Sequence, residues 1–359
     1  MFTSFRGASS DMTPTVSVCI PTYNGAPYLT ACLDSVLAQT SSDIEVLIVD
    51  DCSTDDTLRI ANDLARRDSR IRVCANRHNL GLVGNWNHSV TLAHGEWIKF
   101  VFQDDLILPE CIACMYTVAR DTDVPIVSCA RDFLFEAGTP TELQGEYLRH
   151  KARIHAAFAQ STHWSARDFC EAALKSLTIW NILGEPSAVL LHRSVFERFG
   201  WFNPQLRMLS DFEFWARIAS NTGTVHIPEA LATFRVHELS TSGYHRETEA
   251  GQYRFAVLDP LLILHDYAFH PLFAELRAVA DTRHPPIDLI DEFWKRALGA
   301  LWHANRAARK RVPRDTSLME EWQVAVRGCP RLASIPFSVK LRSKWRTLRR
   351  TMTSSRKRQ

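Results

Sequence analysis

The amino-acid sequence predicts an α/β fold, in which helices cover both faces of a mainly parallel β-sheet. In the first third of the chain, short β-branched runs alternate with segments of helical periodicity, the pattern of parallel strands joined by crossover helices. The strand-like runs are apolar on both faces, which is typical of strands covered by helices on either side. Each run also ends in a polar cluster. These observations indicate a doubly wound, Rossmann-like arrangement.

Four strands and three helices are expected in this part of the chain. The strands are VSVCI (Val16 to Ile20), EVLIVD (Glu45 to Asp50), IRVCA (Ile71 to Ala75) and WIKFVF (Trp97 to Phe102). The helices are 26–38, 55–67 and 81–93, and Ser53 or Asp55 is a candidate cap of the second. The clusters PTYN, DDCSTDD, NRHNLG and QDD follow the four strands. Because ligands bind beyond the carboxyl ends of such strands, we expect the clusters to meet at one rim.

The rest of the chain predicts a less regular half followed by helices. The alternation fades from residue 125 to 191, and LSDFEFWARI then shows helical spacing, with Ser210 as a candidate cap. We expect a mobile lead-in at 1–13, an α/β domain at 14–245, a C-terminal helical extension at 246–335 and a basic amphipathic tail at 336–359.

Charge and hydropathy limit the partners. The formal net charge is only +2, and no Asp or Glu follows Glu321, so the basic character belongs to the tail. No run reaches the roughly 20 apolar residues that cross a bilayer, so an integral membrane protein is not expected. The tail either lies on an anionic membrane, with Trp345 and Leu348 inserted, or packs on the domain; we slightly favour membrane contact. Without a stacking or fold motif, no nucleic-acid partner is expected.

The cysteines indicate a reducing compartment. Their number is nine, which is odd, and their spacings do not form the framework of a small secreted domain, so we expect reduced thiols and a cytoplasmic protein. Cys111 and Cys114 form a CxxC that is either half of a zinc site, a redox pair or simple helix packing. We favour packing, because no second CxxC follows.

Two pairs of adjacent carboxylates at the ends of predicted strands are the main indication of a binding or catalytic site. Asp104 and Asp105 follow an apolar run, where a divalent cation would relieve their repulsion; alternatively, one caps the helix near Pro109 and the other is solvated. Asp50 and Asp51 also end an apolar strand, where a carboxylate can accept hydrogen bonds from a base or a ribose. Neither GxGxxG after the first strand nor GxxxxGK[ST] occurs, which argues against a dinucleotide dehydrogenase or a P-loop enzyme.

Five motifs together resemble those of a known family. PTYNGAPYLTACLDSVLAQT, IEVLIVDDCSTDDT, NLG, GEWIKFVFQDDLILP and SDFEFWARI occur in the order seen in family 2 glycosyltransferases, which are inverting enzymes of the GT-A fold. The resemblance covers roughly Thr15 to Ser242. It implies a nucleotide-diphosphate sugar donor and a divalent cation, Mg²⁺ or Mn²⁺. It also implies a nucleotide-binding half at 14–124 and an acceptor half at 125–245.

The resemblance carries over residue by residue to the matching positions. Asp211 would be the general base, Asp51 would bind the base of the nucleotide, and Asp104 would ligate the metal. Asp50 would support Asp51, and Asp105 would sit beside Asp104, either near the ribose or sugar or behind the metal ligand. The other residues implied for the nucleotide sugar are Pro21, Tyr23, Asn24, Asn79, Gly81, Gln103 and Arg235. His237 would approach the metal or diphosphate, as would Arg235, and Trp180, Asn181 and Glu185 would line the pocket.

Two positions depart from the family pattern. Phe102 stands where the first Asp of the family's DxD motif is expected, so more of the metal's coordination would come from the donor diphosphate and water. Ser210 stands where the family has an acidic neighbour of Asp211. The aromatic neighbours Phe212, Phe214 and Trp215 would raise the pKa of Asp211 by desolvation; alternatively, Asp211 is an ordinary acid at a helix N-terminus.

These observations predict an inverting glycosyltransferase that uses a single displacement. The acceptor would be a glycan or a lipid-linked molecule, in surface polysaccharide or glycolipid biosynthesis. The alternatives are a non-catalytic nucleotide-sugar-binding module, suggested by Phe102, and a nucleotidyltransferase, which would release pyrophosphate.

Overall fold

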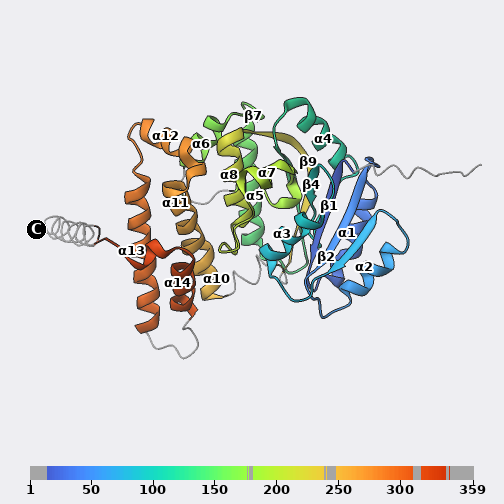
Figure 1. Cartoon of the computed structure of the whole chain (residues 1–359), viewed down its shortest axis with the longest axis horizontal. Helices are drawn as coiled ribbons and strands as arrows, with labels where there is room; N and C mark the ends of the chain where they lie inside the picture. Colours follow the sequence, from blue (N-terminus) through green and yellow to red (C-terminus); the bar gives the residue numbers. More distant parts are fainter. Residues whose placement is uncertain are drawn as a thin grey trace, which may run out of the picture.

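The computed structural model describes residues 14–175, 177, 181–237, 240, 248–309, 317–336 and 339. Figure 1 shows the N-terminal strands and helices at one end of the molecule and the C-terminal helices at the other, with α5 and α8 between them. The lead-in 1–13 lies outside the described residues, as does nearly all of the tail 336–359.

A mixed sheet forms the centre of the α/β part. Within the described ranges its path is β3-β2-β1-β4-β8-β6-β9-β5, and β7 pairs with β9. The strands β1 to β4 pair in parallel, β8 runs antiparallel to both β4 and β6, and β6 and β9 are parallel. Their bounds are β1 Val16–Thr22, β2 Ile44–Asp50, β3 Ile71–Ala75, β4 Trp97–Phe100, β5 Leu106–Ile107, β6 Ile126–Phe135, β7 His163–Trp164, β8 Val189–His192 and β9 Thr224–Val236.

The helices cover both faces of this sheet, as predicted. The strand β1 shows why: Val18 and Ile20 pack with α1 (Ala26–Leu37), α2 (Thr57–Ala65) and α4 (Cys111–Thr122), while Cys19 points into the opposite core. That second core contains α3 (Leu82–Leu92), α6 (Ala166–Lys175) and α8 (Ser210–Thr222). The remaining helices of this part are α5 Thr141–Phe158 and α7 Ser194–Phe199.

The C-terminal helices extend the second core. A single hydrophobic cluster runs from α3 and α8 into this region. Its elements are α10 Glu249–Tyr253, a π-helical turn Arg254–Leu258, α11 Asp259–Phe269, α12 Ala274–Thr282, α13 Leu289–Arg309 and α14 Ser317–Gly328. The helical extension therefore packs directly on the face of the sheet that carries α8. No helix in the described part of the chain is long and apolar enough to cross a bilayer.

The predicted caps differ from those observed. Ser210 is the first residue of α8 rather than its cap, because its hydroxyl donates a hydrogen bond to the carbonyl of Asn203 (3.2 Å) and Leu209 takes the cap position. At α2 the cap position belongs to Asp56, while the carboxylate of Asp55 accepts the N–H of Thr57 (2.9 Å). Ser53 instead donates its hydroxyl to Asp50.

Cys111 and Cys114 both lie on α4, with Cys111 buried. All nine cysteines are free thiols.

Candidate active site

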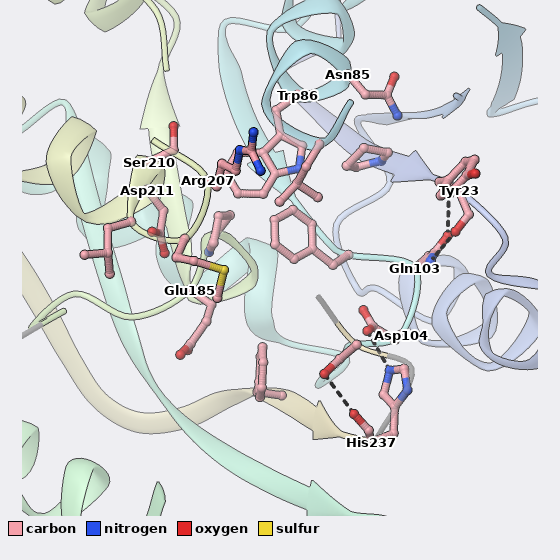
Figure 2. A pocket seen from close by; sticks show the side chains of 18 of the residues that line it. Tyr23, Asn85, Trp86, Gln103, Asp104, Glu185, Arg207, Ser210, Asp211 and His237 are labelled. Carbon is pink, nitrogen blue, oxygen red and sulfur yellow. Dashed lines mark hydrogen bonds and ion pairs between the residues drawn. The ribbon is translucent and has the colours of Figure 1, made fainter. Parts of the chain in front are cut away.

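A cavity of about 1240 Å³ opens at the carboxyl ends of the parallel strands. It is lined by the loops that follow β1, β2, β3 and β4, by α3 and α5, by the segment before α8 and by the end of β9. Figure 2 shows Tyr23, Gln103, Asp104 and His237 around one part of it and Glu185, Asp211 and Arg207 around another. The polar clusters therefore meet at one rim, as the strand pattern predicted.

Asp51 organises the loop on the nucleotide side. Its Oδ1 accepts the N–H of Leu80 (2.7 Å) and the amide of Asn76 (2.8 Å), and its Oδ2 accepts the N–H of Gly81 (2.9 Å). Gly81 has a φ of 74°, a conformation that favours glycine. Among the described residues Oδ2 accepts this one hydrogen bond, which leaves a lone pair that can accept an N–H of a base. Asn79 and Gly81 both line the cavity beside Asp51.

Asp50 holds the neighbouring loop from behind. It is 1% exposed and accepts hydrogen bonds from Thr22 Oγ1 (3.1 Å) and Ser53 N (3.0 Å). Ser53 Oγ in turn accepts the N–H of Asn24 (2.9 Å). Asp50 is not part of the cavity wall, and through Ser53 it holds the loop that carries Asn24.

Gln103 closes the rim over β1. Its amide accepts the N–H of Tyr23 (2.9 Å) and donates to the carbonyl of Tyr23 (3.1 Å). A Cβ at Gly25 would lie 2.1 Å from Gln103 Oε1, so a larger residue there would displace the Gln103 side chain from its hydrogen bonds to Tyr23. Pro21, Tyr23 and Gln103 all line the cavity.

Asp104 and His237 form the candidate metal site. His237 Nε2 lies 2.9 Å from Asp104 Oδ2, and Figure 2 shows this contact at the cavity wall. A carboxylate oxygen and an imidazole nitrogen are both established ligands of divalent cations, so the pair fits such an ion. Within the described residues, no group of three His, Cys, Asp or Glu side chains gathers as metal ligands. A cation at this pair would therefore need oxygens from the donor and from water.

Asp105 and Arg235 lie behind this pair and outside the cavity wall. Asp105 is fully buried and accepts hydrogen bonds from Ser187 Oγ (2.5 Å) and Arg235 N (3.1 Å). Arg235 Nε donates to the carbonyl of Asp104 (2.9 Å). Asp104 lines the cavity, whereas Asp105 and Arg235 do not. The chain turns here, with Asp105 N bonded to Phe102 O (3.0 Å), so the adjacent carboxylates have different surroundings.

Burial and the charge of Asp104 raise the pKa of Asp105 well above its usual range. Asp105 and Arg235 are therefore positioning residues, which fix the backbone that presents Asp104. Neither Asp104 nor Asp105 caps a helix, since α4 begins after Glu110 without a side-chain cap.

Phe102 stands where a carboxylate was expected, and its side chain makes an aromatic contact instead. Its ring stacks on Trp86 with the centroids 4.9 Å apart and an interplanar angle of 28°. Both rings line the cavity. The wall beside the metal pair is therefore apolar.

Asp211 lies near the start of α8, and it is 8% exposed at the cavity wall. Its Oδ1 accepts the N–H of Phe212 (2.7 Å) and its Oδ2 accepts the amide of Asn181 (2.9 Å). Burial, with a smaller contribution from the charge of Glu185, raises the pKa of Asp211 to about 7. A carboxylate of that pKa can accept a proton near neutral pH.

Glu185 lines the cavity next to Asp211 and is paired with a buried arginine. Arg131, which is 3% exposed on β6, donates from Nη2 to Glu185 Oε1 (3.1 Å). Asn181 and Glu185 thus lie at the cavity wall as expected, while Trp180 lies outside the described residues.

Sequence reasoning missed several residues of the wall. They are Trp86 on α3, Tyr147, Arg149, His150 and Arg153 on α5, Arg207 before α8, and Phe255 in the C-terminal extension. No motif marks them. The residues on α5 could have been predicted from their spacing, because positions 146, 149, 150 and 153 lie on one face of a helix.

Comparison with known proteins identifies the family of the chain. A family model described as Glycosyl transferase family 2 matches residues 17–200. An uncharacterized protein of Mycobacterium tuberculosis is 29% identical over 226 residues, which are 62% of this chain and 67% of that protein.

Two solved structures have a similar fold. Staphylococcus aureus TarS 1–349 in complex with UDP-GlcNAc has a TM-score of 0.53 at 17% identity, covering 90% of this chain and 82% of that one. The mannosyltransferase PcManGT of Pyrobaculum calidifontis, in complex with GDP-Man and Mn²⁺, has a TM-score of 0.50 at 18% identity, covering 88% and 87%. At these identities the likeness establishes the fold alone, and the predicted GT-A fold is confirmed.

Proposed function

Because the chain belongs to glycosyl transferase family 2, we propose that it moves a sugar from a nucleotide-diphosphate sugar to an acceptor hydroxyl, with inversion at the anomeric carbon. One observation carries the proposal. The buried carboxyl group of Asp211 shares a cavity with the Asp104–His237 pair, and Figure 2 shows them on different parts of its wall. A donor between them would meet a leaving-group site on one side and a base on the other.

The nucleotide would bind at the ends of β1 and β2. Asp51 would accept a base N–H, and the loop at Asn79 and Gly81 would enclose the base and ribose. Tyr23, half-exposed at the rim, would cover the nucleotide. The UDP-GlcNAc and GDP-Man complexes of the two structural neighbours support a nucleotide sugar as the donor class.

Asp104 and His237 would hold a divalent cation, Mg²⁺ or Mn²⁺. When bound, the ion would supply positive charge that stabilises the leaving diphosphate. Arg235 and Asp105 keep Asp104 in place for this role. The Mn²⁺ in the PcManGT complex supports a cation in this class of site.

Asp211 would take the proton of the acceptor hydroxyl as that oxygen attacks the anomeric carbon. A sugar hydroxyl is a poor nucleophile unless a base removes its proton. Asn181 orients the carboxylate through Oδ2. A single displacement of this kind inverts the anomeric configuration and needs no covalent enzyme intermediate.

The acceptor is proposed to be a glycan or a lipid-linked molecule in surface polysaccharide or glycolipid biosynthesis. A cytoplasmic location with peripheral membrane contact through the tail remains part of this proposal. Co-sedimentation with anionic liposomes, with and without residues after Phe337, tests the membrane contact. Loss of binding on truncation supports it, and equal binding of both forms contradicts it.

The leaving group distinguishes the proposal from its alternatives. We would screen nucleotide sugars for thermal stabilisation with Mn²⁺ and then identify the product released from the best donor. A glycosyltransferase releases a nucleoside diphosphate from the nucleotide sugar, a nucleotidyltransferase instead releases pyrophosphate from a nucleoside triphosphate supplied with a sugar phosphate, and a binding module releases neither.

A further inference from the structure

The helix α5 presents two arginines to the cavity. Arg149 and Arg153 are exposed side chains that line it, together with His150 between them. They are four residues apart, so they lie on the same face of the helix. Like charges at this spacing disfavour an isolated helix. The two arginines therefore do not stabilise α5, and their position on the cavity side has another cause.

The other cation on this part of α5 is arranged differently. Lys151 forms an ion pair with Asp132 and does not line the cavity. Among the described residues, no such ion pair with a carboxylate is formed by Arg149 or Arg153. The guanidinium groups of Arg149 and Arg153 thus face the cavity without an ion pair to any described carboxylate.

A third arginine, Arg207, lines the cavity near Glu185, whose charge acts on His150 of α5. Arg207 lies four residues before Asp211, and Figure 2 shows it in the part of the site that also holds Asp211 and Glu185. Its backbone N–H donates to the buried carboxylate of Asp259 (3.0 Å), and its Nη1 donates to Glu321 Oε1 (2.9 Å). Two C-terminal helices therefore hold this residue in place, α11 through its backbone and α14 through its side chain.

The acidic groups nearby do not cancel this charge. The carboxylate of Glu185 is already paired with Arg131. Burial and the charge of Arg131 lower the pKa of His150 to about 4, so this ring is neutral at pH 7 and can donate or accept a hydrogen bond. Glu146 adds one negative charge, and Arg207 is itself paired with Glu321, so the surplus positive charge of this wall comes from Arg149 and Arg153.

We propose that the acceptor carries an anionic group, a phosphate or a carboxylate, near the hydroxyl that is attacked, and that Arg149, Arg153 and Arg207 bind it. The inference rests on the proposed function and specifies the acceptor class. The guanidinium fork matches the oxygens of phosphate and carboxylate in a bidentate manner, which a neutral sugar does not offer. The donor diphosphate has its own site at Asp104 and His237, on another part of the wall.

The test compares matched acceptors. Initial rates are measured with methyl hexosides, their 6-phosphates and the corresponding uronates, using the nucleotide sugar that the full-length protein turns over. The variant Arg149→Gln/Arg153→Gln is compared with wild type. Lys151→Gln is the matched control, because it removes a cation from the same helix outside the cavity.

We expect wild type to prefer one of the two anionic acceptors, and the double variant to raise KM for it by at least about tenfold, the loss of a charge-assisted contact. The control should stay within about twofold of wild type. A preference for the phosphates over the uronates identifies phosphate as the anion, and the reverse identifies carboxylate. Preference for the neutral hexosides, or an unchanged KM in the double variant, overturns the inference.

Release of nucleoside diphosphate by wild type without acceptor tests the proposed function separately. If no donor is turned over, the proposed function fails. Calorimetric titration of wild type and the double variant with the hexoside 6-phosphates and uronates then tests the arginines alone. Equal heats for both proteins would contradict the inference, and binding lost only in the variant would support it.

Discussion

The amide of Asn181 donates a hydrogen bond to Asp211 Oδ2 over 2.9 Å, and the same amide bonds the carbonyl of Gly184 (3.0 Å). The loop at 181–184 is thereby tied to the start of α8. Burial raises the pKa of Asp211, whereas hydrogen bonds to the carboxylate, such as that from the Phe212 N–H, favour the ionised form. The pKa of about 7 reflects this balance.

Replacing Asn181 should therefore change the pH profile. In Asn181→Ala the carboxylate loses a donor, so the pKa of Asp211 rises further. The base is active when ionised, and the acidic limb of kcat/KM should move to higher pH by about 0.5 to 1 unit, equivalent to roughly 1 kcal/mol. Activity at pH 7 should fall and recover at higher pH. An acidic limb with an unchanged midpoint would show that the amide does not act on Asp211.

Asp211 should also lower the stability of the folded protein at neutral pH. Its folded pKa of about 7 lies above its ordinary value of 3.8, so folding favours the protonated form. Stability is then greatest below pH 4 for this group and is lost as the pH rises through 7, by up to about 4 kcal/mol for a shift of this size. Asp211→Asn should unfold at a higher denaturant concentration than wild type at pH 8, with a smaller gain at pH 5. An equal difference at both pH values would contradict the raised pKa.

The metal pair should control donor binding. Asp104→Asn and His237→Ala should each weaken Mn²⁺-dependent binding of the nucleotide sugar by about tenfold or more, because one of two side-chain ligands is lost. Treatment of wild type with EDTA should have the same effect, and added Mn²⁺ should reverse it. Asp121→Asn is a suitable control, since Asp121 lies on the exposed end of α4 in an ion pair with Arg120. Unchanged calorimetric affinity in Asp104→Asn would exclude the assigned site.

Phe102 offers a gain-of-function test. Phe102→Asp restores the carboxylate expected in the DxD motif and should strengthen Mn²⁺ binding without donor, because ligand charge sets affinity at such sites. The change removes the ring stacked on Trp86, which should cost about 1 kcal/mol or more of the free energy of unfolding. Calorimetry with Mn²⁺ alone and urea unfolding measure the two effects. If affinity for the ion stays the same, residue 102 does not face the metal site.

The first half of the fold could be predicted because its signals are local. Val18 and Ile20 alternate with Cys19, and the polar residues after each strand mark the rim at which they meet. Asp51, Asp104 and Asp211 line one cavity, as the motif order implied.

The remaining features depend on contacts between distant segments. Asp105 follows Asp104 directly, yet a turn buries it against Ser187. Similarly, the place of α5 is set by packing on β6 and β9, with Tyr147 against Phe133 and Phe234. Neither contact has a periodicity or motif that a single sequence would reveal.

The most direct test of the central claim compares nucleoside diphosphate release by wild type, Asp211→Asn and the control Asp132→Asn, with donor, acceptor and Mn²⁺ present. Asp132 is an exposed residue paired with Lys151 and does not line the cavity. We predict that Asp211→Asn loses transfer by about 10² to 10⁴, the usual contribution of a general base, while its donor affinity stays near that of wild type. Full transfer by Asp211→Asn would contradict the account.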